Sequence, residues 1–237
     1  MNGVDSLTQS LDPRLPAKKD DPRVKGDNPK QKKQKKGGHG RNTESFDPES
    51  TYDRPSMRVV VGDPKKEVLP QEIKHDDVVM VPNFFCDEED WDLYYRLVEE
   101  MRDAQERGEK DSQWISWHEG AHLISRNPKG SKTYEEVQRR IAKYFGIEFK
   151  SVGTRFNWYR DSSDWKPFHH DSAAFNPQRA RNQNITVGVS FGATRELAFL
   201  HAKSGQKVYF PQTNGSLISF GRDVNINWKH GINALKT

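Results

Sequence analysis

The sequence predicts an α+β fold in which helices precede a double-stranded β-helix, also called a jelly roll. Between residues 87 and 146, apolar side chains recur at helical spacing. After Gly146 the sequence changes to short alternating segments, most of them separated by Gly, Pro, Asn or Ser. Two helices followed by closely spaced strands of antiparallel type are characteristic of an α+β sandwich or barrel.

The amino-terminal part of the chain differs in composition from the remainder. Residues 1–56 contain no large apolar run and carry 12 Lys and Arg against 9 Asp and Glu, whereas the remainder carries 26 against 25. The whole chain is only 32% hydrophobic, and its mean hydropathy of −1.00 is low for a globular protein. We therefore predict a disordered, basic, low-complexity tail over residues 1–56 and one folded domain over residues 57–237.

A run of basic side chains without an intervening acid lies inside this tail. Such a run attracts phosphate backbones or serves as a nuclear-import signal, although a solvated linker that does neither is an equal alternative. Nucleic acid is therefore a candidate partner of the tail. The run consists of Lys30, Lys32, Lys33, Lys35, Lys36 and Arg41.

Cysteine usage and hydropathy indicate the compartment. Cys86 is the single cysteine, which excludes an internal disulfide framework and favours a reducing compartment, the cytoplasm or the nucleus. No apolar stretch follows Met1, and no apolar run approaches the roughly 20 residues that a membrane-spanning helix needs. We therefore expect no membrane partner.

Two helices are predicted before the strand-rich part. The first follows the acidic segment 87–90 and extends to about Arg107. The second begins with a possible capping box of Thr133 and Glu136 and ends at Gly146. The apolar positions of the first helix are Trp91, Tyr94, Tyr95, Val98 and Met101.

One strand is predicted at residues 78–81, before the first helix, where four apolar residues precede Pro82. Six more strands are predicted after Gly146 from alternation and from the turn residues between them. Their ranges are 154–159, 184–191, 196–200, 207–210, 215–220 and 223–228. The sequence contains no repeat of fixed period.

The triplet His169-His170-Asp171 and the later His230 have the spacing of a non-haem iron site. His-x-Asp lies at the end of a strand, and the distal histidine follows sixty-one residues after the first. Two imidazoles and one carboxylate leave three metal positions open for a co-substrate and oxygen. This arrangement favours Fe(II) oxygenase chemistry over structural zinc, which prefers a closed tetrahedral shell. We expect His170 to face the other side of the strand.

Several motifs in order along the chain resemble the AlkB-like dioxygenases that depend on 2-oxoglutarate and Fe(II). The resemblance covers about residues 150–235. It implies that His169, Asp171 and His230 are the iron ligands and that Asn157 and Tyr159 contact the carboxylates of 2-oxoglutarate. Residues two apart on a strand project from the same face, which agrees with that last role. The motifs are Asn157–Tyr159, Phe168–Asp171, Val187–Gly192, Gly215–Gly221 and Trp228–Ile232.

The resemblance also implies an activity. Fe(II), 2-oxoglutarate and oxygen would be used to hydroxylate a substrate or to demethylate it oxidatively, with succinate and carbon dioxide as by-products. Methylated nucleic acid is the leading substrate because of the family and the basic tail, and a protein side chain or a small molecule is an alternative. A catalytically inactive jelly-roll binding module is the alternative from a different class of function.

One departure from the family pattern concerns the carboxy-terminal end. In the family, an arginine in the strand after the distal histidine pairs with the far carboxylate of 2-oxoglutarate. This sequence ends at Thr237, seven residues after His230, so the final strand is not present. Either the sequence is an incomplete copy of a longer protein or the protein lacks normal co-substrate binding. We favour an incomplete sequence, because stopping within the sheet would expose an unpaired edge.

A second metal motif, His118-Glu119-Gly120-Ala121-His122, matches the zinc metallopeptidase signature H-E-x-x-H. That chemistry requires both histidines one turn apart on a helix. Gly120 lies inside the motif and Asn127-Pro128 follows soon after, which argues against a helix there. We expect instead that the aromatic-rich stretch Trp114–His122 forms part of a lid or wall over the iron pocket.

Overall fold

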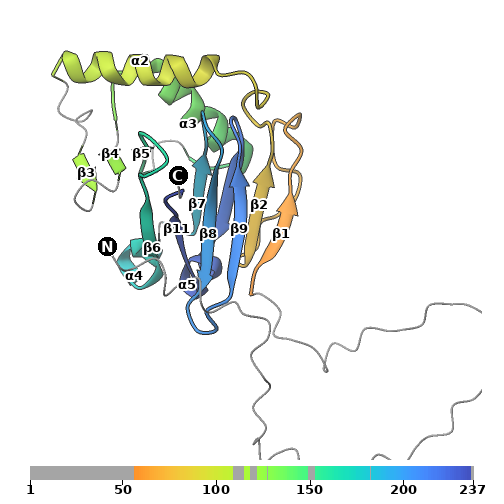
Figure 1. Ribbon diagram of the computed structural model, residues 1–237. Coiled ribbons are helices and arrows are strands. Elements are labelled where there is room, and N and C mark those ends of the chain that lie inside the picture. Colours follow the sequence, from red (N-terminus) through yellow and green to blue (C-terminus); the bar gives the residue numbers. More distant parts are fainter. Residues whose placement is uncertain are drawn as a thin grey trace, which may run out of the picture. The chain divides into compact units, whose positions relative to one another are not determined.

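Two four-stranded sheets face each other in the computed structural model (Figure 1). One sheet has the strand order β1-β2-β10-β7 and the other has the order β6-β11-β8-β9. From β6 onward the chain passes back and forth between the two sheets, which is the connectivity of a jelly roll. The α+β fold with a double-stranded β-helix is therefore confirmed. The structure describes residues 56–108, 115–117, 122–126, 128–148, 153–181 and 183–235, without the side chains of 115–117 and 122–125.

All neighbouring strands pair in the antiparallel direction except β1 and β2, which are parallel. The first sheet contains β1 (Arg58–Val61), β2 (Asp77–Val81), β10 (Leu217–Gly221) and β7 (Ile185–Val189), and the second contains β6 (Lys166–His169), β11 (Trp228–Ile232), β8 (Arg195–His201) and β9 (Lys207–Gln212). A smaller third sheet contains β3 (Ile115–Trp117), β4 (His122–Arg126) and β5 (Arg155–Trp158). Among the described residues no strand follows β11, and only β10 pairs with β7.

The inner core lies between the two large sheets. Phe199 of β8 and Phe220 of β10 meet there with their ring centroids 5.4 Å apart, and both are buried. This contact joins the sheets face to face, as in a β-sandwich. The remaining buried members of this cluster are Val78, Phe210, Ile218, Val224 and Trp228.

A second core lies on the outer face of the first sheet, where Val79, Val81 and Leu217 pack against Tyr144 of helix α3. Helix α3 (Lys132–Phe145) lies against helix α2 (Asp92–Glu106) (Figure 1). Helix α3 thus covers the outer face of the first sheet.

The predicted second helix begins two residues earlier than expected. Ser131 is its N-cap and accepts a hydrogen bond from the backbone N–H of Tyr134, so the predicted capping box at Thr133 is wrong. Ser131 and Thr133 both donate from their hydroxyls to the carboxylate of Glu100 on α2, at 2.7 Å each. Thr133 is thereby used to join the helices. Gly146 ends α3 with φ of 63°, as the sequence predicts.

One predicted strand is a helix. Residues 222–227 form α5 (Arg222–Asn227), and the strand β11 begins only at Trp228. The backbone N–H groups of Asp223 and Val224 both donate to the carbonyl of His75, which turns the chain after β10. Val224 and its neighbour Asn225 are both buried, whereas in a strand they would point to opposite faces. Burial of both side chains therefore overrode the strand-like alternation.

The remaining helical segments of the described ranges are short: the 3-10 turn η4 (Ser172–Ala174) and α4 (Pro177–Ala180) follow β6. None of the helices in the described ranges is long and apolar enough to cross a membrane. The predicted tail, apart from Ser56, lies outside the described residues. Its lack of structure stays a prediction.

Candidate metal centre

His169, Asp171 and His230 come together in the sheet that contains β6 and β11. His169 is the last residue of β6 and pairs directly with His230 of β11, so both imidazoles project from the same face of the sheet. The Nε2 atoms of His169 and His230 lie 3.8 Å and 3.6 Å from the Asp171 Oδ1 atom. One potential ligand atom from each residue lies within 4.8 Å of the other two. The three predicted ligands thus surround a single point.

The hydrogen bonding of His169 leaves one ring nitrogen available. Its Nδ1 atom lies 2.9 Å from the carbonyl oxygen of Pro167. A carbonyl only accepts, so Nδ1 carries the proton and Nε2 keeps its lone pair. Burial, together with the nearby His230 and Lys166 side chains, lowers the pKa of His169 to about 4. His169 is therefore neutral at pH 7, which is the form that binds a metal.

Asp171 is held as a carboxylate. Burial by itself would raise its pKa, but the proximity of His230 and His169 and the hydrogen bond from Thr186 outweigh burial and lower that pKa. The Thr186 hydroxyl on β7 donates to Oδ2 at 2.8 Å. Oδ1 consequently faces the two histidines.

Asn225 fixes the backbone at this carboxylate, a role that no local sequence pattern predicts. Its side-chain oxygen accepts from the Asp171 N–H at 2.8 Å, and its side-chain NH₂ donates to the Asp171 carbonyl at 3.3 Å. His170 lies outside the metal cluster, and its Nδ1 atom is 2.6 Å from the Asn225 carbonyl. Asn225 and Thr186 were missed because hydrogen bonds between residues so far apart in sequence leave no local pattern.

Packing holds the ring of His230. The side chain is buried, and its ring lies 4.9 Å from the ring of Phe220 and 5.9 Å from that of Phe199. Its Nδ1 atom is buried and has no hydrogen-bond partner in the part of the chain that the structure describes. Aromatic contacts thus hold the ring of His230, whereas a hydrogen bond to a backbone carbonyl holds the ring of His169.

The two residues predicted to contact 2-oxoglutarate lie on or next to β5. Asn157 pairs with Ile124 of β4, and Tyr159 follows the end of the strand. Both side chains are partly buried. Burial raises the pKa of the Tyr159 phenol, and the guanidinium carbon of Arg195 lies 5.6 Å from its ring centroid. Neither residue belongs to the metal cluster, and their roles stay predictions.

The donor set fits a divalent first-row metal. Two imidazoles and one ionised carboxylate match the facial triad of non-haem Fe(II) oxygenases, in which three positions remain for other ligands. The hydrogen bonds that orient His169 and Asp171 are the kind of support that metal ligands have in proteins.

The rival zinc motif does not have the required helix. His122 is the first residue of strand β4 and pairs with Trp117 of β3, so it cannot lie one helical turn from His118. Residues 118–121 are outside the described ranges, as are the side chains of the predicted lid Trp114–His122. The extended backbone at His122 argues against the zinc metallopeptidase alternative.

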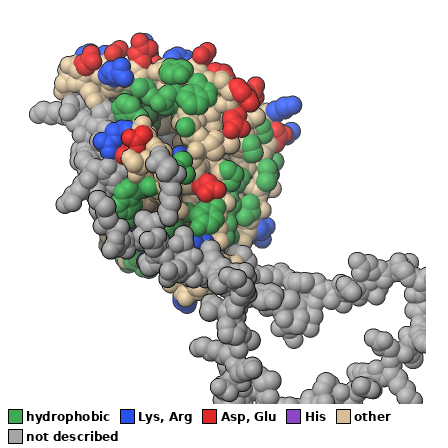
Figure 2. Space-filling view, viewed as in Figure 1, with side chains coloured by type: hydrophobic (Ala, Val, Ile, Leu, Met, Phe, Trp, Pro, Cys, Tyr) green, Lys and Arg blue, Asp and Glu red, His purple; other side chains and the backbone are tan. Residues whose placement is uncertain are grey.

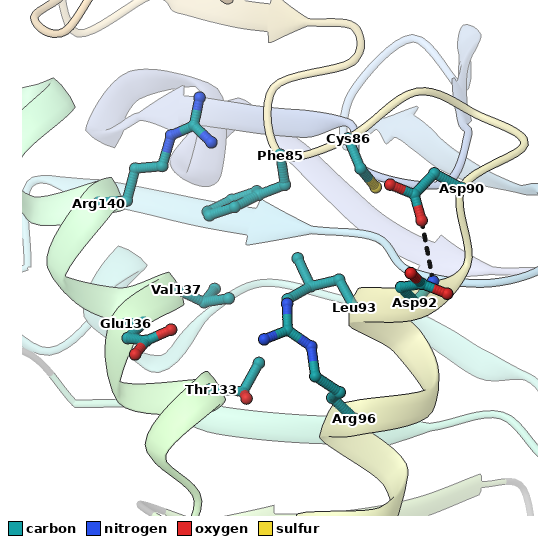
Figure 3. Close-up of a pocket in the computed structure, with 10 residues that line it drawn as sticks. All are labelled: Phe85, Cys86, Asp90, Asp92, Leu93, Arg96, Thr133, Glu136, Val137 and Arg140. Carbon is teal, nitrogen blue, oxygen red and sulfur yellow. Dashed lines mark hydrogen bonds between the residues drawn. The ribbon is translucent and has the colours of Figure 1, made fainter.

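A separate hollow of about 350 Å³ lies between α2 and α3 (Figure 3). Arg96 of α2 and Arg140 of α3 contribute to its lining together with acidic side chains such as Glu136. None of the three clustered metal-site residues lines it. The hollow is therefore distinct from the candidate metal centre.

Comparison with known proteins gives neither a family match nor a curated relative: no family model and no curated protein matches this chain. Among solved structures it is similar to OsALKBH1 (14% identity, 70% of this chain and 89% of that one, TM-score 0.45). It is also similar to a Pseudomonas putida prolyl-4-hydroxylase (13% identity, 68% of this chain and 86% of that one, TM-score 0.43). A third similar structure is an oxidoreductase of the 2OG-Fe(II) oxygenase family from Burkholderia pseudomallei (15% identity, 68% of this chain and 78% of that one, TM-score 0.36). The function of the site therefore depends on the geometry of its own residues.

Proposed function

We propose that this protein is an AlkB-like dioxygenase that depends on Fe(II) and 2-oxoglutarate. One observation carries the proposal: His169, Asp171 and His230 place their ligand atoms around one point, within 4.8 Å of one another. The inner faces of two packed sheets position them, so the cluster is an organised part of the core. Two histidines and one carboxylate are the donor set that leaves room for a bidentate co-substrate and oxygen.

The roles of the protein residues follow from their contacts. His169, Asp171 and His230 would hold Fe(II), and Thr186 would keep one carboxylate oxygen turned away from the metal. Asn157 would contact the co-substrate, as would Tyr159. With Fe(II) bound, 2-oxoglutarate and oxygen supply the oxidising chemistry that hydroxylates a C–H bond or removes an N-methyl group as formaldehyde.

Methylated nucleic acid is the proposed substrate, with a protein side chain or a small molecule as the alternative. On the face shown in Figure 2, acidic and basic side chains lie side by side along α2 (Asp92–Glu106). The folded part carries 26 Lys and Arg against 25 Asp and Glu, so its net charge gives little attraction for phosphates. The basic run between Lys30 and Arg41 supports nucleic acid as partner.

Substitution of each ligand tests the proposed activity. Three ligands share one ion, so His169→Ala, Asp171→Ala and His230→Ala should each lose most of the Fe(II) affinity and the formation of succinate from 2-oxoglutarate. Asn157→Ala should chiefly raise the 2-oxoglutarate concentration required. His170→Ala is the matched control, because His170 lies outside the cluster.

Full turnover in the His230→Ala protein would refute the iron site. Metal binding without succinate formation in the unsubstituted protein would favour the catalytically inactive binding module. Loss of metal binding in His122→Ala, with binding retained in His169→Ala, would restore the zinc alternative.

A further inference from the structure

Lys166 shares a face of its sheet with the metal ligands, although its position in the sequence predicts the opposite. It lies three residues before His169 on β6, and an odd separation in a regular strand places two side chains on opposite faces. The register shifts between His230 and Ile232 of β11, where His169 pairs with His230 and Lys166 pairs with Ile232. This bulge returns Lys166 to the inner face, where His169 also lies.

The ammonium group of Lys166 has no hydrogen bond or ion pair within the described part of the chain. The residue is partly buried, and burial lowers its pKa, which Asp171 raises and Arg155 lowers. Asp171 is therefore near enough to act through its charge, yet the two side chains form no salt bridge. A cation that loses water without gaining a partner carries a cost that an anionic ligand would remove.

Arg195 lies over the ring of Tyr159, one of the predicted co-substrate residues, but its two terminal nitrogens already donate to backbone carbonyls, while its buried Nε atom has no partner among the described residues. It donates to the carbonyls of Asp161, Asp164 and Asn233 at distances from 2.7 to 3.1 Å. These bonds hold the loop before β6 against the chain after β11. Lys166 keeps all three of its N–H donors available.

We propose that Lys166 binds the carboxylate of 2-oxoglutarate that lies away from the metal. Lys166 pairs with Ile232, and His169 pairs with His230 two residues earlier on β11. The two cross-strand pairs are therefore about 6.6 Å apart along the strands. That spacing suits a five-carbon dicarboxylate that takes two metal positions with one end and reaches Lys166 with the other. The assignment rests on the proposed function, because it supposes this co-substrate at the metal.

The test compares two oxo acids in the oxygen-free, Mn(II)-loaded protein by calorimetry. 2-Oxoglutarate carries the far carboxylate, and 2-oxopentanoate has the same carbon chain without it. Lys166→Met should weaken 2-oxoglutarate binding about 10- to 100-fold and leave 2-oxopentanoate binding within about twofold. Lys166→Arg keeps the charge and should recover most of the difference. Lys229→Met is the matched control, because strand alternation places Lys229 on the face opposite His230.

Equal 2-oxoglutarate affinity in Lys166→Met and the unsubstituted protein would overturn the assignment. An equal loss for both oxo acids would also overturn it, since Lys166 would then act on the structure of the site alone. Calorimetry with Mn(II) alone separates the proposals. An unsubstituted protein that binds no Mn(II) contradicts the metal site itself, and one that binds Mn(II) but neither oxo acid contradicts the co-substrate.

Discussion

At the scale of single residues, one buried amide determines where the metal-binding carboxylate points. Asn225 is 5% exposed and makes two hydrogen bonds to the backbone of Asp171. The carboxylate follows directly from that backbone, so a small rotation there would move Oδ1 away from His169 and His230. Neighbours that orient a ligand in this way affect metal affinity without touching the metal.

Asn225→Ala should therefore weaken metal binding about 10- to 100-fold while the three ligands remain in place. Titration with Mn(II) measures the affinity, and thermal unfolding of the metal-free protein measures stability separately. Asn227→Ala is the control, because Asn227 lies on the same helix and donates only to the Asp223 carbonyl. Equal metal affinity in the two variants would show that Asn225 does not position the carboxylate.

At the scale of elements, the bulge between β6 and β11 needs a glycine. A Cβ atom at Gly231 would lie 2.7 Å from the Lys166 carbonyl oxygen and 3.1 Å from the Phe168 nitrogen. Both atoms are backbone, which cannot rotate out of the way. The close approach of the two strands at this point brings His169 and His230 together.

Gly231→Ala should force β6 and β11 apart. The expected loss is about 1–3 kcal/mol in the free energy of unfolding, as for other overpacked sites. The metal affinity should fall as well, since the two histidines separate. Chemical denaturation and Mn(II) titration measure the two effects. Gly153→Ala is the control, since a Cβ atom there has no neighbour within 4 Å. Unchanged stability in Gly231→Ala would contradict the close packing at the bulge.

A buried carboxylate anchors the parallel pair of β1 and β2. Asp77 is 2% exposed and accepts from Arg58 at 2.5 and 2.8 Å and from the Lys74 N–H at 2.8 Å. The hydrogen bond from Arg58, together with that of Lys74, lowers the pKa of Asp77 despite burial. The folded protein therefore holds Asp77 ionised at a pH where the unfolded chain would protonate it.

The stability that Asp77 contributes should depend on pH. Because the folded pKa is depressed, the contribution is complete above the ordinary value of 3.8 and is lost as the pH falls below it. Asp77→Asn should cost about 1–2 kcal/mol at pH 7, reduced by the exposure of Arg58. The difference in the free energy of unfolding between Asp77→Asn and the unsubstituted protein should become smaller below about pH 4. Urea denaturation across this range measures it, and a constant difference would contradict the ionised pair.

At the scale of the whole molecule, charge is distributed unequally along the chain. Residues 1–56 carry an excess of cations, 12 against 9, while the remainder is almost balanced. Any long-range attraction for nucleic acid should therefore come from the basic run Lys30–Arg41. The folded part would then discriminate between substrates at short range.

Deletion of residues 30–41 should weaken nucleic-acid binding and flatten its dependence on salt. Each lost phosphate contact reduces the slope of log affinity against log salt by about 0.7 to 0.9. Fluorescence anisotropy with a labelled oligonucleotide at several salt concentrations measures the slope. Succinate formation with a small substrate should be unchanged, since the metal site is elsewhere. An unaltered slope would assign nucleic-acid binding to the folded part or exclude it.

Local sequence patterns predict the features that depend on neighbouring residues. Helical spacing and Gly146 predict α3, and turn residues predict most of the strands. The triplet that begins at His169, together with the later His230, predicts the candidate ligands. The remaining features depend on contacts between distant parts of the chain. Residues 222–227 became a helix because Val224 and Asn225 are both buried. Lys166 faces the site because two strands pair with a bulge. Each outcome depends on a partner distant in sequence, and local periodicity carries no record of such a partner.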